Sequence, residues 1–232
     1  MITAVLWDVD GTLLDFTAAE RAAVRKLFGE FGLGECTDEM LARNAAINVS
    51  FWERLARNEI PKPRVLVGRF EQFFAEYGID PGIAPAFNRR YQPALGDTIV
   101  YRDGSIDIVR SLKGKVRQYV VSNGTVDAQT KKLRVSGLGE LMDGIFLSEE
   151  LGVEKPNTAF FTAVLDAVRP GNLSEVLIVG DSLTSDIRGG MNAGIRTCWY
   201  DPGKHAVPEG YRVDWQIADL HEAVALLEKE NA

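Results

Sequence analysis

The chain has few cysteines, few histidines and no long apolar run, and each shortage argues against a class of protein. Only two cysteines, Cys36 and Cys198, occur among 232 residues, which argues against a disulfide framework or a C-x-x-C metal site. His205 and His221 stand alone. No apolar stretch approaches the roughly 20 residues that span a bilayer. The amino terminus lacks the basic segment that opens a signal peptide. We therefore expect a cytoplasmic protein without a membrane partner.

Positive charge is also scarce, with 26 lysines and arginines against 33 acidic residues and a formal net charge of −7. This balance argues against a nucleic acid polymer as a partner. The hydrophobic content of 46% and the charged content of 25% are ordinary for a globular protein. No P-loop, G-x-G-x-x-G or H-E-x-x-H string occurs. The length suits one large domain or two modest ones, and a monomer or a small homo-oligomer.

Short apolar runs alternate with segments whose apolar residues have helical spacing. The runs cover residues 3–9, 117–122, 176–180 and, more weakly, 144–147 and 196–199. The helical segments cover residues 105–112, 126–135, 157–168 and 187–193. This alternation predicts an α/β fold, with a Rossmann-like parallel sheet and helices on both faces. Sites in such sheets lie beyond the carboxyl ends of the strands, where Asp8, Ser122 and Asp181 stand.

The interval between Asp10 and Ser122 is too long for a single crossover unit of roughly 30 residues. Within it, helical spacing recurs over residues 18–31, 38–56, 64–77 and 84–92. We therefore expect an inserted α-helical cap at residues 16–96, over the carboxyl edge of the sheet. The remaining residues, 1–15 and 97–232, would form the core.

Two carboxylates, Asp8 and Asp10, leave the first apolar run with one residue between them. Such a pair can divide the work of phosphoryl transfer. One carboxylate attacks phosphorus, while the other is kept more neutral by its neighbour and donates a proton to the leaving oxygen. Gly11 allows the chain to turn sharply after them. By itself, an Asp-Gly pair is equally typical of a plain turn after a core strand.

Two further segments supply groups that bind phosphate. Ser122, Asn123 and Gly124 offer a hydroxyl and backbone N–H groups ahead of a helix, although such a sequence is also common in turns. Lys155 precedes a proline that keeps it extended, so its ammonium can reach the strand ends. A lone lysine is more often solvated, and the hypothesis therefore depends on the segments converging.

The last segment supplies acids. Asp181 and Asp8, with a backbone carbonyl, would offer the hard oxygen ligands that suit Mg²⁺. Asp186 is better placed to hold Lys155 than to bind the metal, although it could simply compensate a helix dipole. Four carboxylates in one pocket would repel strongly, so a divalent cation and Lys155 are the expected compensation.

Together, the segments LWDVDGTLLDF, VVSNG, VEKPN and GDSLTSDIRGG resemble the four motifs of the haloacid dehalogenase-like (HAD) hydrolase superfamily. The resemblance covers essentially the whole chain, and the helical insertion resembles the small α-helical cap of that superfamily. Two longer stretches sharpen it, SNGTVDAQTKKLRVSGLGELMDGIFLSEELGVEKPNTAFF and GDSLTSDIRGGMNAGIRTCWY. They resemble the pyrimidine 5′-nucleotidase branch, whose members act on canonical and non-canonical nucleoside monophosphates.

The resemblance implies a role for each motif residue. Asp8 would form an aspartyl-phosphate, and Asp10 would be the general acid/base and a metal ligand through its carbonyl. The phosphoryl group would be bound by Ser122, Asn123 and Lys155, the Mg²⁺ by Asp8, Asp10 and Asp181, and Lys155 would be oriented by Asp186. Gly11 departs from the D-x-D-D-T form of many close relatives, which weakens the branch assignment but leaves the chemistry intact. An acid at position 10 favours phosphate over carbon–halogen chemistry.

The resulting hypothesis is Mg²⁺-dependent hydrolysis of a small phosphomonoester, with a pyrimidine nucleoside monophosphate as the expected substrate. A sugar-phosphate phosphatase or a phosphomutase is the main rival, and a non-catalytic phosphate-sensing module is a third possibility. In the cap, Phe16 could stack on a base, and Asn44 and Asn48, one helical turn apart, could read a pyrimidine edge. The ordinary alternative is that the aromatics form core and the asparagines are solvated.

Overall fold

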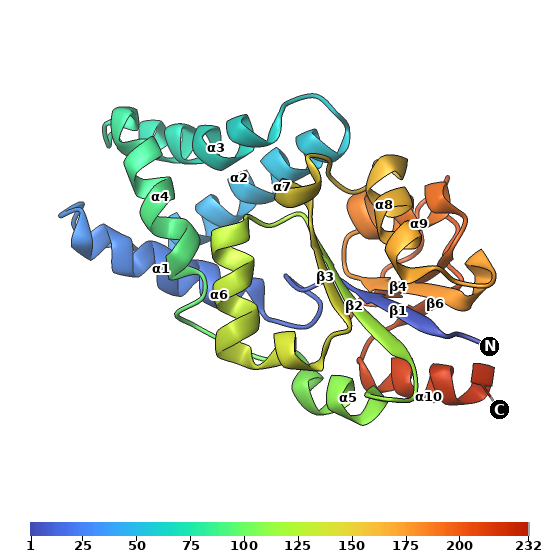
Figure 1. The fold of residues 1–232 in the computed structure, drawn as a ribbon. Helices are drawn as coiled ribbons and strands as arrows, with labels where there is room; N and C mark the ends of the chain where they lie inside the picture. The colour runs from blue at the N-terminus through green and yellow to red at the C-terminus, as the bar shows by residue number, and fades with distance from the viewer. Residues whose placement is uncertain (232) are drawn as a thin grey trace. The chain divides into compact units, whose positions relative to one another are not determined.

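The computed structural model describes residues 1–231, and its chain divides into two compact units. One unit combines Met1–Asp15 with the residues from Val100 onward, and the other comprises Phe16–Ile99. Figure 1 shows a sheet with helices in the first unit and helices alone in the second. Among the described residues, no helix combines the length and the apolar character needed to cross a membrane.

The first unit is built on a six-stranded sheet in which every pairing is parallel. Its strand order is β3-β2-β1-β4-β5-β6, so β1 lies in the middle with β2 and β4 beside it. The strands are β1 (Ala4–Trp7), β2 (Arg117–Ser122), β3 (Gly144–Leu147), β4 (Val176–Gly180), β5 (Arg196–Tyr200) and β6 (Trp215–Ile217). This confirms the predicted α/β fold, and β6 is a strand that the apolar runs did not indicate.

Helices cover both faces of this sheet, with α8 and α9 on one side and α5 and α10 on the other (Figure 1). The helices are α5 (Ser105–Leu112), α6 (Val126–Ser136), α7 (Ser148–Leu151), α8 (Thr158–Val168), α9 (Arg188–Ala193) and α10 (His221–Asn231). Two of them begin at side-chain caps, because Thr125 Oγ1 accepts from Ala128 N and Asn157 Oδ1 accepts from Ala159 N. The caps fix where α6 and α8 begin relative to the strand ends.

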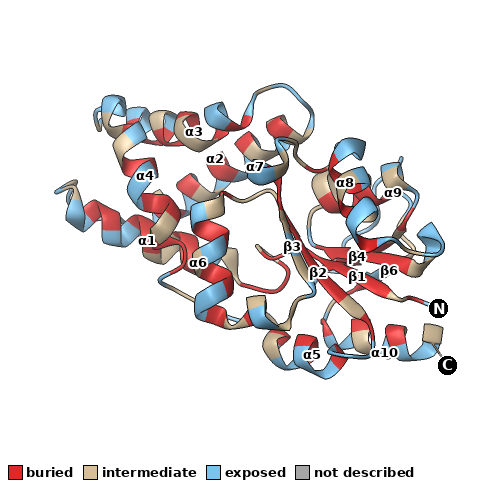
Figure 2. Ribbon diagram, in the orientation of Figure 1, coloured by how far each residue is buried: buried red, intermediate tan, exposed pale blue. Residues whose placement is uncertain are grey.

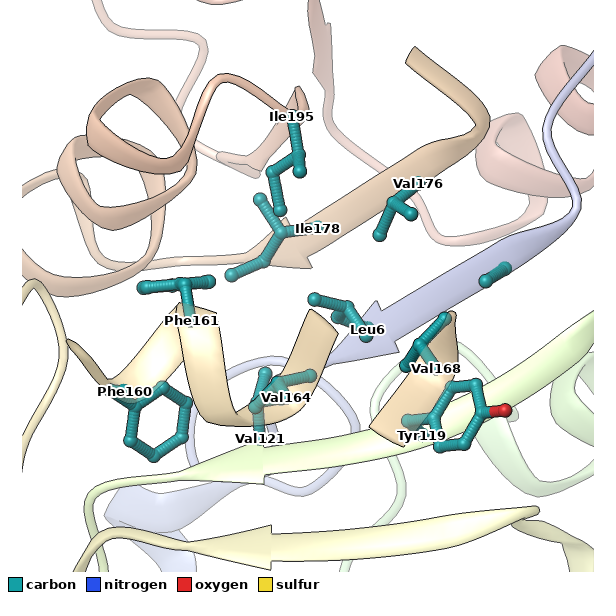
Figure 3. Close-up of a cluster of buried hydrophobic side chains, with 11 residues drawn as sticks. Leu6, Tyr119, Val121, Phe160, Phe161, Val164, Val168, Val176, Ile178 and Ile195 are labelled. Carbon is teal, nitrogen blue, oxygen red and sulfur yellow. The ribbon is translucent and has the colours of Figure 1, made fainter. Parts of the chain in front are cut away.

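The core of the first unit lies between the central strands and α8. Every residue of β1 and β4 is buried, as Figure 2 shows. Leu6 and Ile178 pack with Phe161 and Val164 of α8, which Figure 3 draws as one apolar cluster. Strands buried on both faces read as continuous apolar runs, which is why the sequence revealed them. This core holds β1, β2 and β4 rigidly side by side.

The second unit consists of four longer helices around an aromatic core. The helices are α1 (Phe16–Glu30), α2 (Asp38–Ala56), α3 (Lys62–Glu76) and α4 (Ala84–Ala94). The ring of Phe87 lies 4.9 Å from that of Phe70 and 5.0 Å from that of Phe74, both near edge-to-face. The four helices were each predicted from the spacing of their apolar residues, within two residues at either end.

Candidate active site

The register of the sheet brings the first, second and fourth motifs to one edge. Trp7, the last residue of β1, is paired with Val120 of β2 and Val179 of β4. The next residue, Asp8, donates its backbone N–H to the Val179 carbonyl at 3.0 Å. Asp8, Ser122 and Asp181 therefore all stand at the carboxyl ends of adjacent parallel strands, as the sequence predicted.

Lys155 is the centre of the site. Its Nζ donates to Asp8 Oδ1 at 2.8 Å, to Asp186 Oδ1 at 2.6 Å and to the Val121 carbonyl at 2.8 Å. An ammonium carries three N–H donors, so these three acceptors use all of them. The lysine is 1% exposed. The two carboxylates compensate its buried charge and orient it toward the strand ends.

Burial and charge shift the acidity of this cluster. Desolvation raises the pKa of Asp8 to about 7, and the negative charge of Asp186 adds to the rise while Lys155 opposes it. Burial alone would lower the pKa of Lys155, but the charges of Asp186 and Asp8 outweigh burial and raise that pKa above its usual value. Lys155 therefore stays charged, whereas ionising the Asp8 carboxyl group costs free energy.

Asp181 is tied to the first motif through a threonine. Thr12 Oγ1 accepts from the Asp181 backbone N–H at 3.0 Å and lies 3.3 Å from both Asp8 Oδ2 and Asp181 Oδ1, to one of which it donates. Loss of solvent around the carboxylate and repulsion from Asp8 and Asp186 raise the pKa of Asp181 well above its usual range. Because Asp181 as a whole residue is exposed to solvent, repulsion accounts for the rise better than loss of solvent does. A bound cation would relieve it.

Gly11 leaves space for that carboxylate. Its φ of +100° suits glycine, and a Cβ built there would lie only 2.4 Å from Asp181 Oδ2. The glycine of the first motif therefore permits both the turn and the close approach of Asp181.

Asp186 lies in a π-helical turn, Leu183–Ile187, that directly precedes α9. Its Oδ1 accepts from Lys155, and its Oδ2 accepts from the Ser182 backbone N–H at 3.1 Å. Ser182 Oγ in turn accepts from Ser185 N at 3.2 Å and stabilises the start of the turn. A Cβ on Gly180 would lie 2.4 Å from the Asp186 carboxyl carbon, so that glycine permits the approach.

Three carboxylates converge closely enough to share one cation. One oxygen from each of Asp8, Asp181 and Asp186 lies within 4.8 Å of the other two. Hard oxygen donors of this kind fit Mg²⁺, which is usually held by one or two carboxylates and keeps several waters. Both oxygens of Asp186 are already bound, one by Lys155 and the other by the Ser182 backbone N–H, so the donor set that fits best is Asp8 with Asp181. Bound there, a divalent cation would offset the negative charge of the site.

The second motif divides its work between two residues. Ser122 is buried, and its Oγ accepts from the Gly124 backbone N–H at 3.0 Å. The side-chain amide of Asn123 is used by the backbone of Lys155, with Oδ1 accepting at 2.8 Å and Nδ2 donating at 2.9 Å. Asn123 therefore holds Lys155 in place, and any contact it makes with phosphate would come from its backbone.

Asp10 is bound by two residues that the motif analysis did not select. Gln129 Nε2 donates to its Oδ2 at 2.6 Å, and Lys132 Nζ is ion-paired with its Oδ1. Both residues belong to the buried side of α6, together with Ala128 and Leu133. No sequence signal distinguished Gln129 and Lys132, because polar side chains in a helix are usually solvated, whereas the threonine of D-x-D-G-T could have revealed Thr12.

The residues predicted to read the substrate lie in the second unit. Phe16 is the first residue of α1. Asn44 Nδ2 donates to Glu20 Oε1 at 3.2 Å, and Asn48 Oδ1 accepts from Trp52 Nε1 at 3.0 Å and from the buried Arg69. Both asparagines are buried, so the alternative that they are solvated is wrong. Their use in reading a base stays a prediction.

The fold and site can now be compared with known proteins. A model of the haloacid dehalogenase-like hydrolase family matches residues 2–194. The HAD-hydrolase YfnB of Bacillus subtilis is 36% identical over 228 residues, which cover 98% of this chain and 96% of YfnB. The Escherichia coli pyrimidine 5′-nucleotidase YjjG is 30% identical over 96% of both chains. The Streptococcus pneumoniae pyrimidine 5′-nucleotidase PynA is 34% identical over 85% of this chain and 83% of PynA.

A solved structure agrees with these similarities. The crystal structure of YfnB bound to magnesium has a TM-score of 0.90 and 33% identity, covering 97% of this chain and 98% of that one. The family that the four motifs resemble is thus confirmed by an independent match and by a shared fold. The chain is an enzyme of the haloacid dehalogenase-like hydrolase family.

Proposed function

We propose that the protein is a Mg²⁺-dependent phosphomonoester hydrolase that works through an aspartyl-phosphate on Asp8. The observation that carries the proposal is the convergence on Asp8 of a buried lysine at 2.8 Å and a threonine hydroxyl at 3.3 Å. Lys155 favours the ionised form of this carboxylate, which is the nucleophilic form. A carboxylate held in this way at the carboxyl end of a central strand is suited to attack.

The proposed reaction has two steps. In the first, an Asp8 oxygen forms a bond to phosphorus, the ester P–O bond breaks, and Asp10 gives its proton to the leaving oxygen. In the second, water attacks the phosphorus of the aspartyl-phosphate, Asp10 takes up a proton from that water, and Asp8 is released with inorganic phosphate. Because charge is spread over the three equatorial oxygens, nearby cations and N–H donors lower the barrier.

Lys155 and Ser122 are the side chains we assign to the phosphoryl group. All three donors of Lys155 have protein acceptors, so a phosphoryl oxygen would take the place of one of them. The Asp8 contact is the one to exchange, since that oxygen is consumed when Asp8 attacks. Asp8 and Asp181 would hold the Mg²⁺, which neutralises charge that develops on the transferring group.

The proposed substrate class is the pyrimidine nucleoside 5′-monophosphates. Support comes from the two pyrimidine 5′-nucleotidases that match most of the chain at 30% and 34% identity. We further propose that the helical unit, residues 16–96 by sequence, acts as a cap that selects the substrate. The site chemistry described above is common to any phosphomonoester, so the specificity rests on the relatives alone.

The test is phosphate release over a panel of pyrimidine and purine monophosphates and sugar phosphates, with and without Mg²⁺. We expect turnover only with the metal, and faster for pyrimidine nucleotides. Equal rates across the panel would reject the nucleotidase assignment and keep the phosphatase. Transfer of phosphate to a second hydroxyl of the product would instead indicate a mutase.

The nucleophile has its own test, the Asp8→Asn variant. Asparagine can keep both contacts, accepting from Lys155 and donating to Thr12, so the fold should survive while attack is lost. Wild-type turnover of p-nitrophenyl phosphate by this variant would disprove the mechanism. Absence of turnover by the wild-type protein on every phosphomonoester would favour a phosphate-sensing module.

A further inference from the structure

Both carboxylate oxygens of Asp10 are held from the same helix. Gln129 Nε2 donates to Oδ2 at 2.6 Å, and Lys132 Nζ pairs with Oδ1. The two residues are three positions apart on α6, so their side chains lie on one face, one turn from each other. A carboxyl group bound at both oxygens by two donors of a capped helix has little freedom to rotate.

This arrangement carries a cost that packing alone does not explain. Gln129 is fully buried and Lys132 is 1% exposed. A buried charge is costly unless it is paired, and Gln129 Oε1 is buried without a hydrogen-bond partner among the described residues. Apolar side chains would fill these two positions of α6 without that cost. The polar pair therefore points to a task beyond holding the helix in place.

The second motif leaves room for this contact. A Cβ on Gly124 would lie 2.4 Å from Gln129 Nε2, so a larger residue there would displace the amide that binds Asp10. The glycine of Ser122-Asn123-Gly124 thus links the phosphate-binding segment to the side chain that holds Asp10.

We propose that Lys132 and Gln129 are positioning residues for the proton transfer made by Asp10. They donate to lone pairs on the two oxygens, so the carboxyl group can still carry its own proton toward the leaving oxygen. As the ester bond breaks, that proton passes to the leaving oxygen and Asp10 becomes a carboxylate, which the Lys132 ammonium stabilises. This inference rests on the proposed function, because it assigns a partner to the acid of that reaction.

Leaving-group dependence separates this role from a structural one. p-Nitrophenolate leaves readily without a proton, whereas the alkoxide of a nucleotide or sugar phosphate needs one. The quantity to compare is kcat/KM, which reports the transfer to Asp8 and is blind to the later hydrolysis step. A residue that acts through Asp10 should affect kcat/KM for the alkyl ester far more than for the aryl ester.

The experiment measures kcat/KM for p-nitrophenyl phosphate and for the alkyl phosphomonoester that the wild type hydrolyses fastest. We expect Lys132→Met to lower the alkyl value about 10- to 100-fold while the aryl value stays within about threefold, given the size of general-acid effects and of small misplacements. Gln129→Leu keeps the ion pair and should change the ratio in the same direction. If the Lys132→Met variant does not fold, Gln129→Leu provides the test instead.

Two further variants complete the design. Arg134→Met removes an exposed cation from α6 and should leave both values unchanged. In an Asp10→Asn background, Lys132→Met should cause no further loss on the alkyl ester, since its effect passes through the Asp10 carboxyl.

The results that would overturn the inference are equal losses on both substrates, or a Lys132→Met loss that persists without the Asp10 carboxyl. Either would mean that Lys132 supports the fold or binds phosphate directly. If the wild type hydrolyses neither ester, the proposed function itself fails, and that outcome is distinct from an unchanged ratio in an active enzyme.

Discussion

Lys155 and Asp186 form an ion pair in which Nζ lies 2.6 Å from Oδ1 and each side chain is 1% exposed. The second oxygen of Asp186 is bound by a backbone N–H, so the pair is anchored on both sides. Removing one member of such a pair leaves the other buried and uncompensated, which is far more damaging than losing an exposed ion pair. The pair therefore stabilises the structure of the candidate site.

The first prediction follows from this pair. Lys155→Met keeps the length of the side chain but leaves Asp8 and Asp186 without their cation. We expect the free energy of unfolding to fall by about 3–5 kcal/mol, as for other broken buried pairs, with urea denaturation as the measurement. Lys115→Met, which removes an exposed lysine, should change it by less than about 0.5 kcal/mol. A similar small change for Lys155→Met would show that the ion cluster contributes little to stability.

The second prediction concerns Gly11, whose Cβ would meet Asp181 at 2.4 Å. Gly11→Ala should cost about 1–3 kcal/mol of stability from backbone strain and should also displace the Asp181 carboxylate. The matched control is Gly114→Ala, because Gly114 has a φ of +79° but no atom near the position of a Cβ. Both variants should lose stability in thermal unfolding, and Gly11→Ala alone should need more Mg²⁺ for half-maximal turnover. Equal Mg²⁺ requirements would reject this role of Gly11.

The sequence predicted the parts of the fold whose patterns are local. Strands buried on both faces, such as β1 and β4, read as apolar runs, and the helices of the second unit read as repeating apolar positions. β6 is three residues long and α10 follows it, and a short strand at the edge of a sheet carries too little pattern to be recognised. The π-helical turn around Asp186 depends on hydrogen bonds that Ser182 accepts from the backbone N–H groups of Ser185, Asp186 and Ile187, which no periodicity indicates.

The candidate site shows the same division. Asp8, Ser122 and Asp181 could be placed because residues that end parallel strands meet at one edge. Lys132 could not be placed, because a lysine in a helix is usually solvated and only the fold reveals that this one is buried. The pairing of Asn48 with Arg69 escaped for that reason too, since burial of polar groups depends on contacts between distant segments.

The third prediction concerns the pH dependence of stability in the metal-free protein. The pKa of Asp8 rises from 3.8 to about 7 on folding, so the folded state holds the proton more tightly than the unfolded state. Stability contributed by this proton is present below about pH 4 and is lost as the pH rises toward 7. Asp8→Asn cannot ionise and escapes that loss. In EDTA, we expect its advantage over the wild type to be about 1–3 kcal/mol larger at pH 8 than at pH 4.

The measurement is urea denaturation of both proteins at several pH values. Asp166→Asn, which neutralises an exposed acid, should show a difference from the wild type that does not vary with pH. If the difference in stability between Asp8→Asn and the wild type were independent of pH, ionisation of Asp8 would not be what destabilises the folded protein.

The fourth prediction tests the metal without measuring activity. Mg²⁺ that binds only the folded protein raises its stability by RT ln(1 + [Mg²⁺]/Kd), about 2.7 kcal/mol at 100 times Kd. For a chain of this size, such a gain corresponds to a rise in Tm of about 5–10 °C.

Asp181→Asn removes one charged ligand from the cluster with Asp8, so its rise in Tm should fall below about 2 °C at the same Mg²⁺ concentration. Asp166→Asn should keep the full rise, and sodium chloride at equal ionic strength should not produce it. Because the Asp181→Asn substitution would also relieve the repulsion described above, the variant should start from a higher Tm without metal. A full Mg²⁺-dependent rise in Asp181→Asn would place the cation elsewhere on the protein.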